Sequence, residues 1–302
     1  MFKSHSKKRI LILPGGGATG VTTVRVLEAL EEKLGRPLSQ LFDEIWAASV
    51  GSMMAAYLTE PRFGTSVRSA QQVGQLIRES FANPWSAWHC LDRLQSEIHP
   101  DLRLSDTVIP LKILTAKVKN FPKRESPVFG RFETQAIGLC SETSGDLSLV
   151  QAVRASCAVY PVMPAQRLRL DPQDLDGIVC IDSGCRVCTE PTLDPTRVFF
   201  EDLNEQASHS ETPIQLFFIS NGWARWSIQI QNSSIEVLNF DLDLSPRFQS
   251  LGPSQLGKRI CSNLIGMGFT SISALDSWAK DAIYGKNWEV FQQMVRELRP
   301  VS

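Results

Sequence analysis

The feature that most constrains this chain is a short apolar run followed at once by a glycine cluster. Residues Arg9–Leu13 read as a buried strand, and Pro14 with the segment GGGATG at 15–20 then predicts a tight turn. Behind this turn, apolar residues recur at helical spacing until a stop signal at Gly35. A strand, a glycine turn and a helix in this order are typical of α/β folds, in which helices cover a mostly parallel sheet.

The same arrangement follows directly, with a strand predicted over 42–48 and a helix over 50–58. Further strands are predicted at 111–118, 128–134, 178–181, 214–220 and 235–242. Further helices are predicted at 66–82, 150–158, 255–282 and 291–298. Because strands and helices alternate, we expect a three-layer α/β/α sandwich with a mainly parallel sheet.

The chain shows no internal repeat, low-complexity tract or linker that would divide it. We therefore expect a single domain over 1–302, with a motif-bearing core at about 9–222 and a C-terminal strand and helices at about 235–300.

The charge balance and the apolar segments limit the partners and the location. With 31 basic and 32 acidic residues the net charge is −1, which argues against nucleic acid as a partner. The apolar run near the N-terminus is too short for a signal-peptide core, and no stretch of about 18 apolar residues predicts a transmembrane helix. These features favour a cytoplasmic protein with peripheral membrane contact at most, although export by a dedicated secretion machine is also compatible with them.

An odd number of cysteines favours reduced thiols over a disulfide framework. The cluster C-x4-C-x2-C at 180–188 has two interpretations, a set of metal ligands or buried thiols. Buried thiols are favoured, and no metal is expected, because no fourth ligand lies nearby. The seven cysteines are Cys90, Cys140, Cys157, Cys180, Cys185, Cys188 and Cys261.

The strongest local motif is AASVG at 47–51, between the second predicted strand and its helix. A serine on a sharp strand-to-helix turn has its hydroxyl exposed, and small neighbours let strand and helix approach, as in the G-x-S-x-G nucleophile elbow. The helix at 50–58 also points its N-terminal amides toward negative charge that develops there. Ser49 is thus a candidate nucleophile, and the alternative is a tight packing turn.

The glycine segment at 15–20 has three interpretations. Its backbone amides can form an oxyanion hole, or the spacing Gly15-x-Gly17-x-x-Gly20 can bind a dinucleotide, or the turn is only structural. Dinucleotide binding requires an acidic residue at the end of the next strand, where this chain has Ala47–Ser49. The oxyanion loop is the favoured interpretation.

A serine nucleophile requires a base. The four histidines, His5, His89, His99 and His209, lie in terminal, irregular or polar segments. Asp182 instead ends the apolar run at 178–181, and the ends of parallel strands are where catalytic groups gather. Burial would raise the pKa of this aspartate and make it a better base, and the alternative is an aspartate that caps a turn.

These three motifs together resemble the patatin-like phospholipase family, which combines a glycine-rich oxyanion loop, a G-x-S-x-G elbow and a D-G-G/A motif. The chain has GGGATG at 15–20, AASVG at 47–51 and DSG at 182–184, in the family's order. Segments 152–164 and 219–222 are similar to the segments that flank the family's catalytic aspartate.

The resemblance implies a patatin-like fold and a lipid acyl hydrolase with a Ser-Asp dyad. By it, Ser49 attacks the ester, Asp182 takes the proton, and amides of Gly16, Gly17 and Val50 stabilise the oxyanion. It implies a lipid or membrane-surface substrate and no cofactor, and a protein activator is a further candidate partner. The motif-supporting positions are Gly15, Gly20, Ala47, Gly51 and Gly184.

The chain departs from the family pattern where Thr19 replaces a basic residue, Ala47 a glycine and Ser183 a glycine. Losing the cation at position 19 weakens attraction to a phosphate head group and changes how the loop is anchored. The alternative function is therefore a catalytically weak or inactive lipid-binding or scaffold protein on the same fold.

Trp85 and Trp88 lie in a proline-broken stretch at 83–100, for which short helices or a loop are expected. Tryptophan favours the membrane–water boundary, so the pair is a candidate membrane anchor. Ordinary packing is the favoured interpretation.

Overall fold

The computed structural model describes residues 7–62, 66–121, 132–160, 162–170, 173, 176–184, 195–220, 230, 232–242 and 270–299. Predictions for 128–131, 221–222 and 255–269, and for His5, Cys185, Cys188 and Cys261, lie outside these residues.

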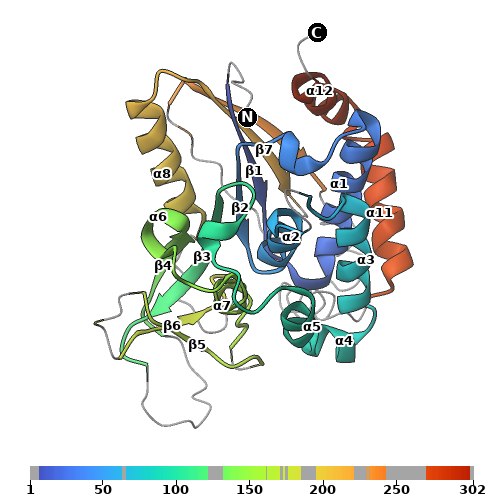
Figure 1. Cartoon of the computed structure of the whole chain (residues 1–302). Coiled ribbons are helices and arrows are strands. Elements are labelled where there is room, and N and C mark those ends of the chain that lie inside the picture. Colours follow the sequence, from blue (N-terminus) through green and yellow to red (C-terminus); the bar gives the residue numbers. More distant parts are fainter. Residues whose placement is uncertain are drawn as a thin grey trace, which may run out of the picture.

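Figure 1 shows a central sheet with helices on both faces, the predicted three-layer α/β/α sandwich. The strands are β1 (Lys8–Leu13), β2 (Glu44–Ala48), β3 (Leu111–Val118), β4 (Thr134–Cys140), β5 (Gln166–Leu168), β6 (Ile178–Ile181), β7 (Ile214–Ser220) and β8 (Ile235–Asp241). The α-helices are α1 (Gly20–Leu34), α2 (Val50–Thr59), α3 (Ala70–Ser80), α4 (Pro84–Trp88), α5 (Cys90–Glu97), α6 (Ser141–Ser144), α7 (Leu149–Ser156), α8 (Pro195–His209), α11 (Ile272–Tyr284) and α12 (Trp288–Leu298). Short 3-10 helices are η1 (Gly17–Thr19), η2 (Leu38–Gln40) and η3 (Leu104–Asp106).

The described strands form one mixed, mostly parallel sheet in the order β5-β6-β3-β2-β1-β7-β8, with β4 also paired to β3. Strands β3, β2, β1, β7 and β8 are parallel to their neighbours within this set. In contrast, β4 and β6 pair antiparallel with β3, and β5 pairs antiparallel with β6. The parallel part of the sheet therefore carries an antiparallel extension at one end.

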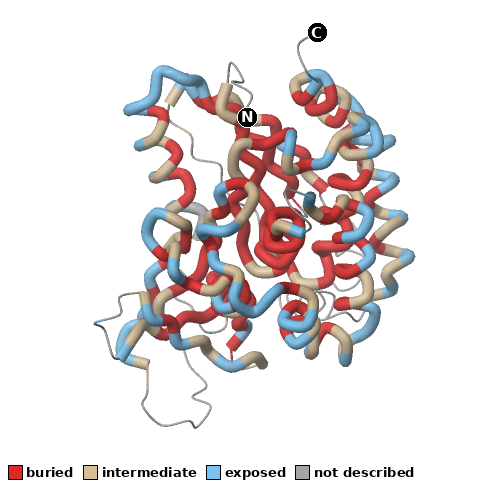
Figure 2. The backbone as a smooth tube through the Cα atoms, viewed as in Figure 1, coloured by how far each residue is buried: buried red, intermediate tan, exposed pale blue. Residues whose placement is uncertain are grey.

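Side chains of β1 alternate between two hydrophobic layers, as the period of a strand requires. Leu11 and Leu13 join the larger core with α1, α2, α3, α7, α11 and α12. Ile10 and Ile12 face the other side, where they pack with Phe199 of α8. Figure 2 shows that the buried segments are concentrated in the sheet and α2, while exposed segments form the rim.

The helix boundaries follow local signals. Helix α1 ends at Gly35, whose φ of 63° is left-handed and favours glycine. Helix α3 starts with a capping box between Ser69 and Gln72. Within the described residues, none of the helices combines the length and apolarity needed to cross a membrane.

Most sequence predictions of elements are confirmed, with small shifts at the ends. The sequence missed α8 and β5, and it ended a strand at Thr134, where the structure begins β4. It also treated Asp182 as following a parallel strand. That expectation was wrong, because β6 runs antiparallel to both of its neighbours.

Candidate active site

Ser49 lies on a strained strand-to-helix turn. Strand β2 ends at Ala48 and α2 begins at Val50, and Ser49 between them has φ 50° and ψ −128°. Among described residues, positive φ in a residue other than glycine occurs only at Ser49 and Asn120. Such a conformation costs about 1–3 kcal/mol and persists only where the surroundings impose it. The geometry is that expected of a nucleophile elbow.

Gly51 lets this turn lie directly against the end of β1. A Cβ on Gly51 would lie 2.1 Å from the carbonyl oxygen of Leu13 and 2.7 Å from that of Pro14. Backbone cannot move aside cheaply, so this position requires glycine. Ala47, which replaces the first elbow glycine of the family, is fully buried in the core, so its methyl group is accommodated there.

Two hydroxyls hold the turn in place, and the sequence analysis assigned neither a role. The backbone N–H of Ser49 donates to Ser156 Oγ at 2.8 Å, and the Ser156 hydroxyl donates to the carbonyl of Leu114 at 2.6 Å. The Ser52 hydroxyl donates to the carbonyl of Ser49 at 2.5 Å. Ser156 thus joins α7, β3 and the elbow. Its signal in the sequence was a serine among the apolar residues of the helix predicted at 150–158.

The glycine segment lies against the elbow. A Cβ on Gly15 would lie 2.8 Å from Ser49 Cβ and 3.6 Å from Ser49 Oγ. Gly16 and Gly17 have φ values of 140° and 56°, and η1 begins at Gly17. At the end of the loop, a Cβ on Gly20 would lie 2.8 Å from a methyl group of Val50. The structure therefore brings the predicted oxyanion loop and Ser49 together.

Thr19 closes this loop from within. Its side chain is fully buried, and its hydroxyl donates to the carbonyl of Gly16 at 2.9 Å, while its N–H reaches the same oxygen at 3.2 Å. At the position where the family has a basic residue, this chain therefore has a neutral side chain that holds the loop closed.

Asp182 reaches the elbow through the antiparallel extension of the sheet. Leu114 of β3 is level with Ala48, the last residue of β2, so β3 continues beyond the parallel edge. Strand β6 pairs with that continuation, with Ile181 opposite Ala116, and runs back toward the elbow. Asp182 follows β6 and so arrives beside Ser49.

Two hydrogen-bonded contacts fix the end of β6. The Thr115 hydroxyl lies 2.9 Å from the carbonyl oxygen of Ile181 and 3.0 Å from that of Ala155. The N–H of Asp182 donates to the carbonyl of Ala158 at 2.9 Å. The last residue of α7 and the segment that follows it therefore position the elbow and the aspartate, respectively.

The Asp182 carboxylate is buried, with 4% of the residue exposed, and its described partners are neutral donors. The Ser49 side chain lies beside it, and the N–H of Gly184 donates to Oδ1 at 2.7 Å. Burial raises the pKa of Asp182 to about 6, and the Ser49 side chain and the N–H of Gly184 oppose the rise. A carboxylate with such a pKa accepts a proton more readily than an exposed aspartate and is still ionised at neutral pH.

Cys157 completes the wall of the site, and the sequence analysis did not assign it there. Its sulfur lies 3.7 Å from Ser52 Oγ and near the Ser49 side chain. Burial raises the pKa of this thiol well above its ordinary value, so it stays protonated. Cys90, Cys140 and Cys180 are buried free thiols as well.

The histidines of the described chain lie elsewhere on the surface. His99 and His209 are exposed, and His89 contacts Asp92 at 3.0 Å. Among the residues that the structure describes, no group of three or more His, Cys, Asp or Glu side chains is placed to hold a metal ion.

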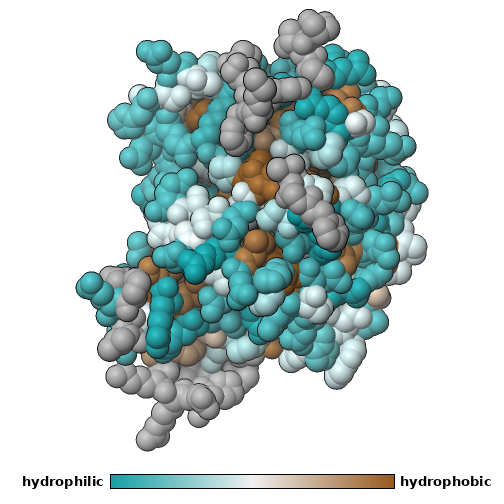
Figure 3. All heavy atoms as spheres, in the orientation of Figure 1, coloured by the Kyte–Doolittle hydropathy of each residue, from teal (hydrophilic) through white to brown (hydrophobic). Residues whose placement is uncertain are grey.

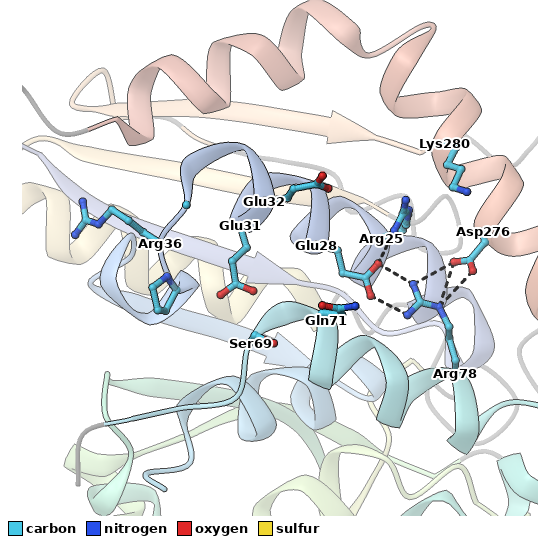
Figure 4. Close-up of a pocket in the computed structure, with 12 residues that line it drawn as sticks. Arg25, Glu28, Glu31, Glu32, Arg36, Ser69, Gln71, Arg78, Asp276 and Lys280 are labelled. Carbon is cyan, nitrogen blue, oxygen red and sulfur yellow. Dashed lines mark hydrogen bonds and ion pairs between the residues drawn. The ribbon is translucent and has the colours of Figure 1, made fainter. Parts of the chain in front are cut away.

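A charged groove of about 790 Å³ lies apart from this site, between α1, α3 and α11 (Figure 4). Arg78 donates to Glu28 at 2.7 and 2.8 Å and to Asp276 at 3.3 Å, which ties the three helices together. Glu31 accepts the N–H of Ala70 at the start of α3. These charges are explained by helix packing.

Comparisons with known proteins match the part of the chain that holds the site. A family model described as patatin-like phospholipase matches residues 11–192. A protein of Escherichia coli described as a cUMP-AMP-activated phospholipase is 29% identical over 196 residues, which cover 61% of this chain and 57% of that protein. Phospholipase A I of Arabidopsis thaliana is 29% identical over 175 residues, which cover 52% of this chain and 12% of that protein.

The chain thus spans little more than half the length of the first of these relatives and a small part of the second. The crystal structure of VipD from Legionella pneumophila aligns with 86% of this chain and 56% of its own, with a TM-score of 0.40 and 13% identity.

Proposed function

The chain belongs to the patatin-like phospholipase family, and on this premise we propose that it is a lipid acyl hydrolase with Ser49 and Asp182 as its catalytic dyad. The observation that carries the proposal is that the strained Ser49 lies beside a buried carboxylate whose pKa is raised to about 6. The names of both curated relatives, which describe phospholipases, support lipid as the substrate class.

In the proposed reaction the Ser49 hydroxyl attacks the ester carbonyl while its proton passes to the Asp182 carboxylate. The carbonyl π electrons move to oxygen, and the amides of Gly16, Gly17 and Val50 stabilise this oxyanion. When the oxyanion collapses, the bond to the alcohol oxygen breaks, and Asp182 returns its proton to the leaving alcohol. The products of this half-reaction are an acyl-serine and the free alcohol.

The second half-reaction uses the same groups in reverse. Asp182 takes a proton from water, whose oxygen attacks the acyl-serine carbonyl, and the oxyanion again faces the same amides. Collapse breaks the bond to Ser49 Oγ, and the proton held by Asp182 returns to that oxygen. The fatty acid leaves, and the dyad is restored. The proposed steps use no metal ion and no organic cofactor.

The departures from the family pattern bear on the substrate. Thr19 anchors the loop without adding a positive charge, so we expect neutral lipids or simple esters to be accepted as well as phospholipids. Ser183 is buried next to the base. A catalytically weak or inactive lipid-binding protein is the competing function, since three positions differ together.

The test compares ester hydrolysis by the wild type, Ser49→Ala and Asp182→Asn. We expect the wild type to hydrolyse a short-chain p-nitrophenyl ester and to release fatty acid from mixed phospholipids, and both variants to lose this activity. Because the Escherichia coli relative is named for activation by cUMP-AMP, each assay is run with and without that nucleotide. A protein is another candidate activator, so a third set of assays is run with added cell extract.

Exposed positions provide matched controls for the two substitutions. Ser208→Ala on α8 and Asp101→Asn after α5 make the same chemical changes on the surface and should leave turnover unchanged. Equal activity in the wild type and Ser49→Ala, in every arm, would contradict the enzymatic function and favour the lipid-binding one.

We also propose that the described segments form a single domain. Helix α1 of the motif-bearing core contacts both α11 and α12, and α12 packs on β8. A single cooperative transition in calorimetry is expected, and separate transitions for the two segments would contradict it.

A further inference from the structure

Two strands share one edge of β3, and Thr115 lies between them. Leu114 is level with the last residue of β2, while Ala116 is opposite the last residue of β6. The other edge of β3 pairs with β4 along this whole stretch. Strand β2 leads into Ser49 and β6 leads into Asp182. Thr115 is therefore the single residue of β3 between the strand of the candidate nucleophile and the strand of the candidate base.

The Thr115 hydroxyl spans this junction. The residue is fully buried, and its Oγ1 lies 2.9 Å from the carbonyl oxygen of Ile181 and 3.0 Å from that of Ala155. Ala155 belongs to the last turn of α7, where carbonyl groups have no partner within the helix. The single proton of the hydroxyl is placed to serve either oxygen. It thus joins the end of β6 to the end of α7.

The hydroxyl acts on the peptide unit that leads into Asp182. The carbonyl of Ile181 and the N–H of Asp182 belong to one planar peptide group. Thr115 donates to this carbonyl, and the N–H donates to the carbonyl of Ala158 at 2.9 Å. Because both polar groups of the peptide are held, the direction in which the Asp182 side chain leaves the backbone is set.

The same end of α7 holds the nucleophile. Ser156 accepts the N–H of Ser49 at 2.8 Å and donates to the carbonyl of Leu114 at 2.6 Å. Two adjacent residues of β3 thus contact two adjacent residues of α7, since Thr115 donates to Ala155. The end of β6 is thereby tied to the residues that hold Ser49.

We propose that Thr115 is a positioning residue of the acyl hydrolase, and that its hydroxyl sets where the Asp182 carboxylate lies relative to Ser49. The inference rests on the proposed function, in which Asp182 takes the proton of Ser49. A base must lie within hydrogen-bond reach of that proton, and a displacement of about 1 Å lowers a rate about 10²-fold. Because Thr115 is fully buried, its loss should lower kcat and leave substrate binding nearly unchanged.

The experiment compares Thr115→Ala with Thr115→Ser, which differ only in the hydroxyl. On a soluble p-nitrophenyl ester, Thr115→Ala should lose about 10- to 100-fold in kcat with KM within about twofold, and Thr115→Ser should recover most of the loss. Valine is not used here because its second methyl group would lie at the place of the hydroxyl, 2.9 and 3.0 Å from two carbonyl oxygens. Wild-type kcat in Thr115→Ala would overturn the proposal.

A further variant decides the question if Thr115→Ala does not fold. Thr115→Cys keeps the side-chain volume and has a weaker donor, so its kcat should lie below that of Thr115→Ser. A kcat of Thr115→Cys equal to that of the wild type would overturn the proposal.

The ionisation of Asp182 gives a readout that does not depend on turnover. It is followed by carbon-13 NMR of the labelled carboxyl group and assigned with Asp182→Asn. Burial raises the pKa of Asp182 to about 6, and the Ser49 side chain and the N–H of Gly184 oppose the rise. A buried carboxylate that loses its alignment with these donors should titrate at higher pH in Thr115→Ala and return to the wild-type value in Thr115→Ser.

The NMR titration separates the two proposals. An unchanged or lower pKa in Thr115→Ala would overturn the positioning role, whatever the turnover. If the wild type fails to hydrolyse the ester while the pKa of Asp182 shifts as expected, the proposed function fails alone.

Thr59→Ala is the matched control for Thr115→Ala. Thr59 is also fully buried, and its hydroxyl donates to the carbonyl of Ala55 at 2.9 Å, at the end of α2 remote from Ser49. Its kcat and the pKa of Asp182 should stay at the wild-type values. Losses equal to those of Thr115→Ala would assign both effects to packing and overturn the proposal.

Exposed side chains provide a second control. Trp85 is 75% exposed and Trp88 is 55% exposed, so ordinary packing, the interpretation favoured from the sequence, is wrong for these side chains. On the face drawn in Figure 3, hydrophobic side chains reach the surface in small areas separated by hydrophilic ones. Trp85→Ser and Trp88→Ser leave the buried junction intact, so turnover of the soluble ester should be unchanged. A loss of kcat equal to that of Thr115→Ala would contradict a specific role of the Thr115 hydroxyl.

Discussion

Two buried carboxylates in this molecule have opposite surroundings. Glu28 of α1 is 8% exposed, and Arg78 donates to both of its oxygens at 2.7 and 2.8 Å. Asp182 is 4% exposed, and its described polar neighbours are the Ser49 hydroxyl and the backbone N–H of Gly184. One carboxylate is matched by a guanidinium group and the other by neutral donors only.

Burial of a carboxylate is therefore not enough to identify it as a candidate catalytic group. Where a cation matches the charge, the carboxylate joins helices, and the same contact raises the pKa of Arg78. Where only neutral donors are present, burial dominates and raises the pKa of Asp182 toward neutrality, which is what a base requires. Replacing each acid by its amide should therefore have opposite effects on stability, and only Asp182→Asn should lose activity.

The largest expected effect is the loss of activity in Asp182→Asn. Removing the proposed base should lower kcat by about 10³- to 10⁴-fold. At pH 7.5 the same change should increase the free energy of unfolding by up to about 3 kcal/mol, because a buried charge without a cation is removed. Turnover assays and urea denaturation measure the two effects.

The sign of this stability change depends on pH. Since the pKa of Asp182 is raised in the folded protein, the native state holds its proton more tightly, and stability from the neutral carboxyl is lost as pH rises through about 6. The advantage of Asp182→Asn should thus vanish near pH 4. An advantage that is equal at both pH values would contradict an elevated pKa.

The opposite result is expected for Glu28→Gln. The change removes one of the two carboxylates that face Arg78 and leaves Asp276, and it should cost up to about 3 kcal/mol of stability while turnover per folded molecule stays within about twofold. The exposed Glu32→Gln on the same helix is the control. A selective loss of turnover in Glu28→Gln would remove the distinction between the two carboxylates.

A smaller effect is expected from Ser156→Ala. This change tests whether the hydroxyl that accepts the N–H of Ser49 contributes to turnover. It leaves the N–H of Ser49 without its partner, at a cost of about 1–3 kcal/mol. If Ser156 positions the nucleophile, kcat should fall about tenfold with KM little changed, and Ser156→Thr should recover part of it.

Ser80→Ala is the matched control for Ser156→Ala. Its hydroxyl is also buried and donates to a backbone carbonyl, that of Leu76 at 2.8 Å, but on α3. Equal losses of kcat in the two variants would show that Ser156 contributes only to the stability of the fold and does not position Ser49.

The last prediction concerns the pH dependence of the wild type and needs no substitution. Protonation of Asp182 removes the base, so kcat/KM should fall about tenfold per pH unit below about pH 6. A profile that stays flat from pH 7.5 to 4.5 would show that the group with this pKa takes no part in turnover.

Local sequence signals were sufficient for much of the fold. Apolar runs and glycine stops predicted β1, α1, β2 and α2, because a buried strand or an amphipathic helix leaves its own periodicity in the chain. Helix α8 was missed although Phe199, Leu203 and Ala207 recur at four-residue spacing. Strand β4 was misplaced because its pairing with β3, and not its own composition, sets where it begins.

The sequence by itself determined the elbow at Ser49 and the glycine loop beside it, since both depend on neighbours in the chain and on the small size of Gly15 and Gly51. Only the tertiary structure decided that Asp182 reaches this serine. Its approach depends on β6 pairing antiparallel with the part of β3 that extends beyond the parallel edge, and on the contacts of α7 that hold it there. Strand pairing is a contact between distant segments, so its direction and register are properties of the folded sheet.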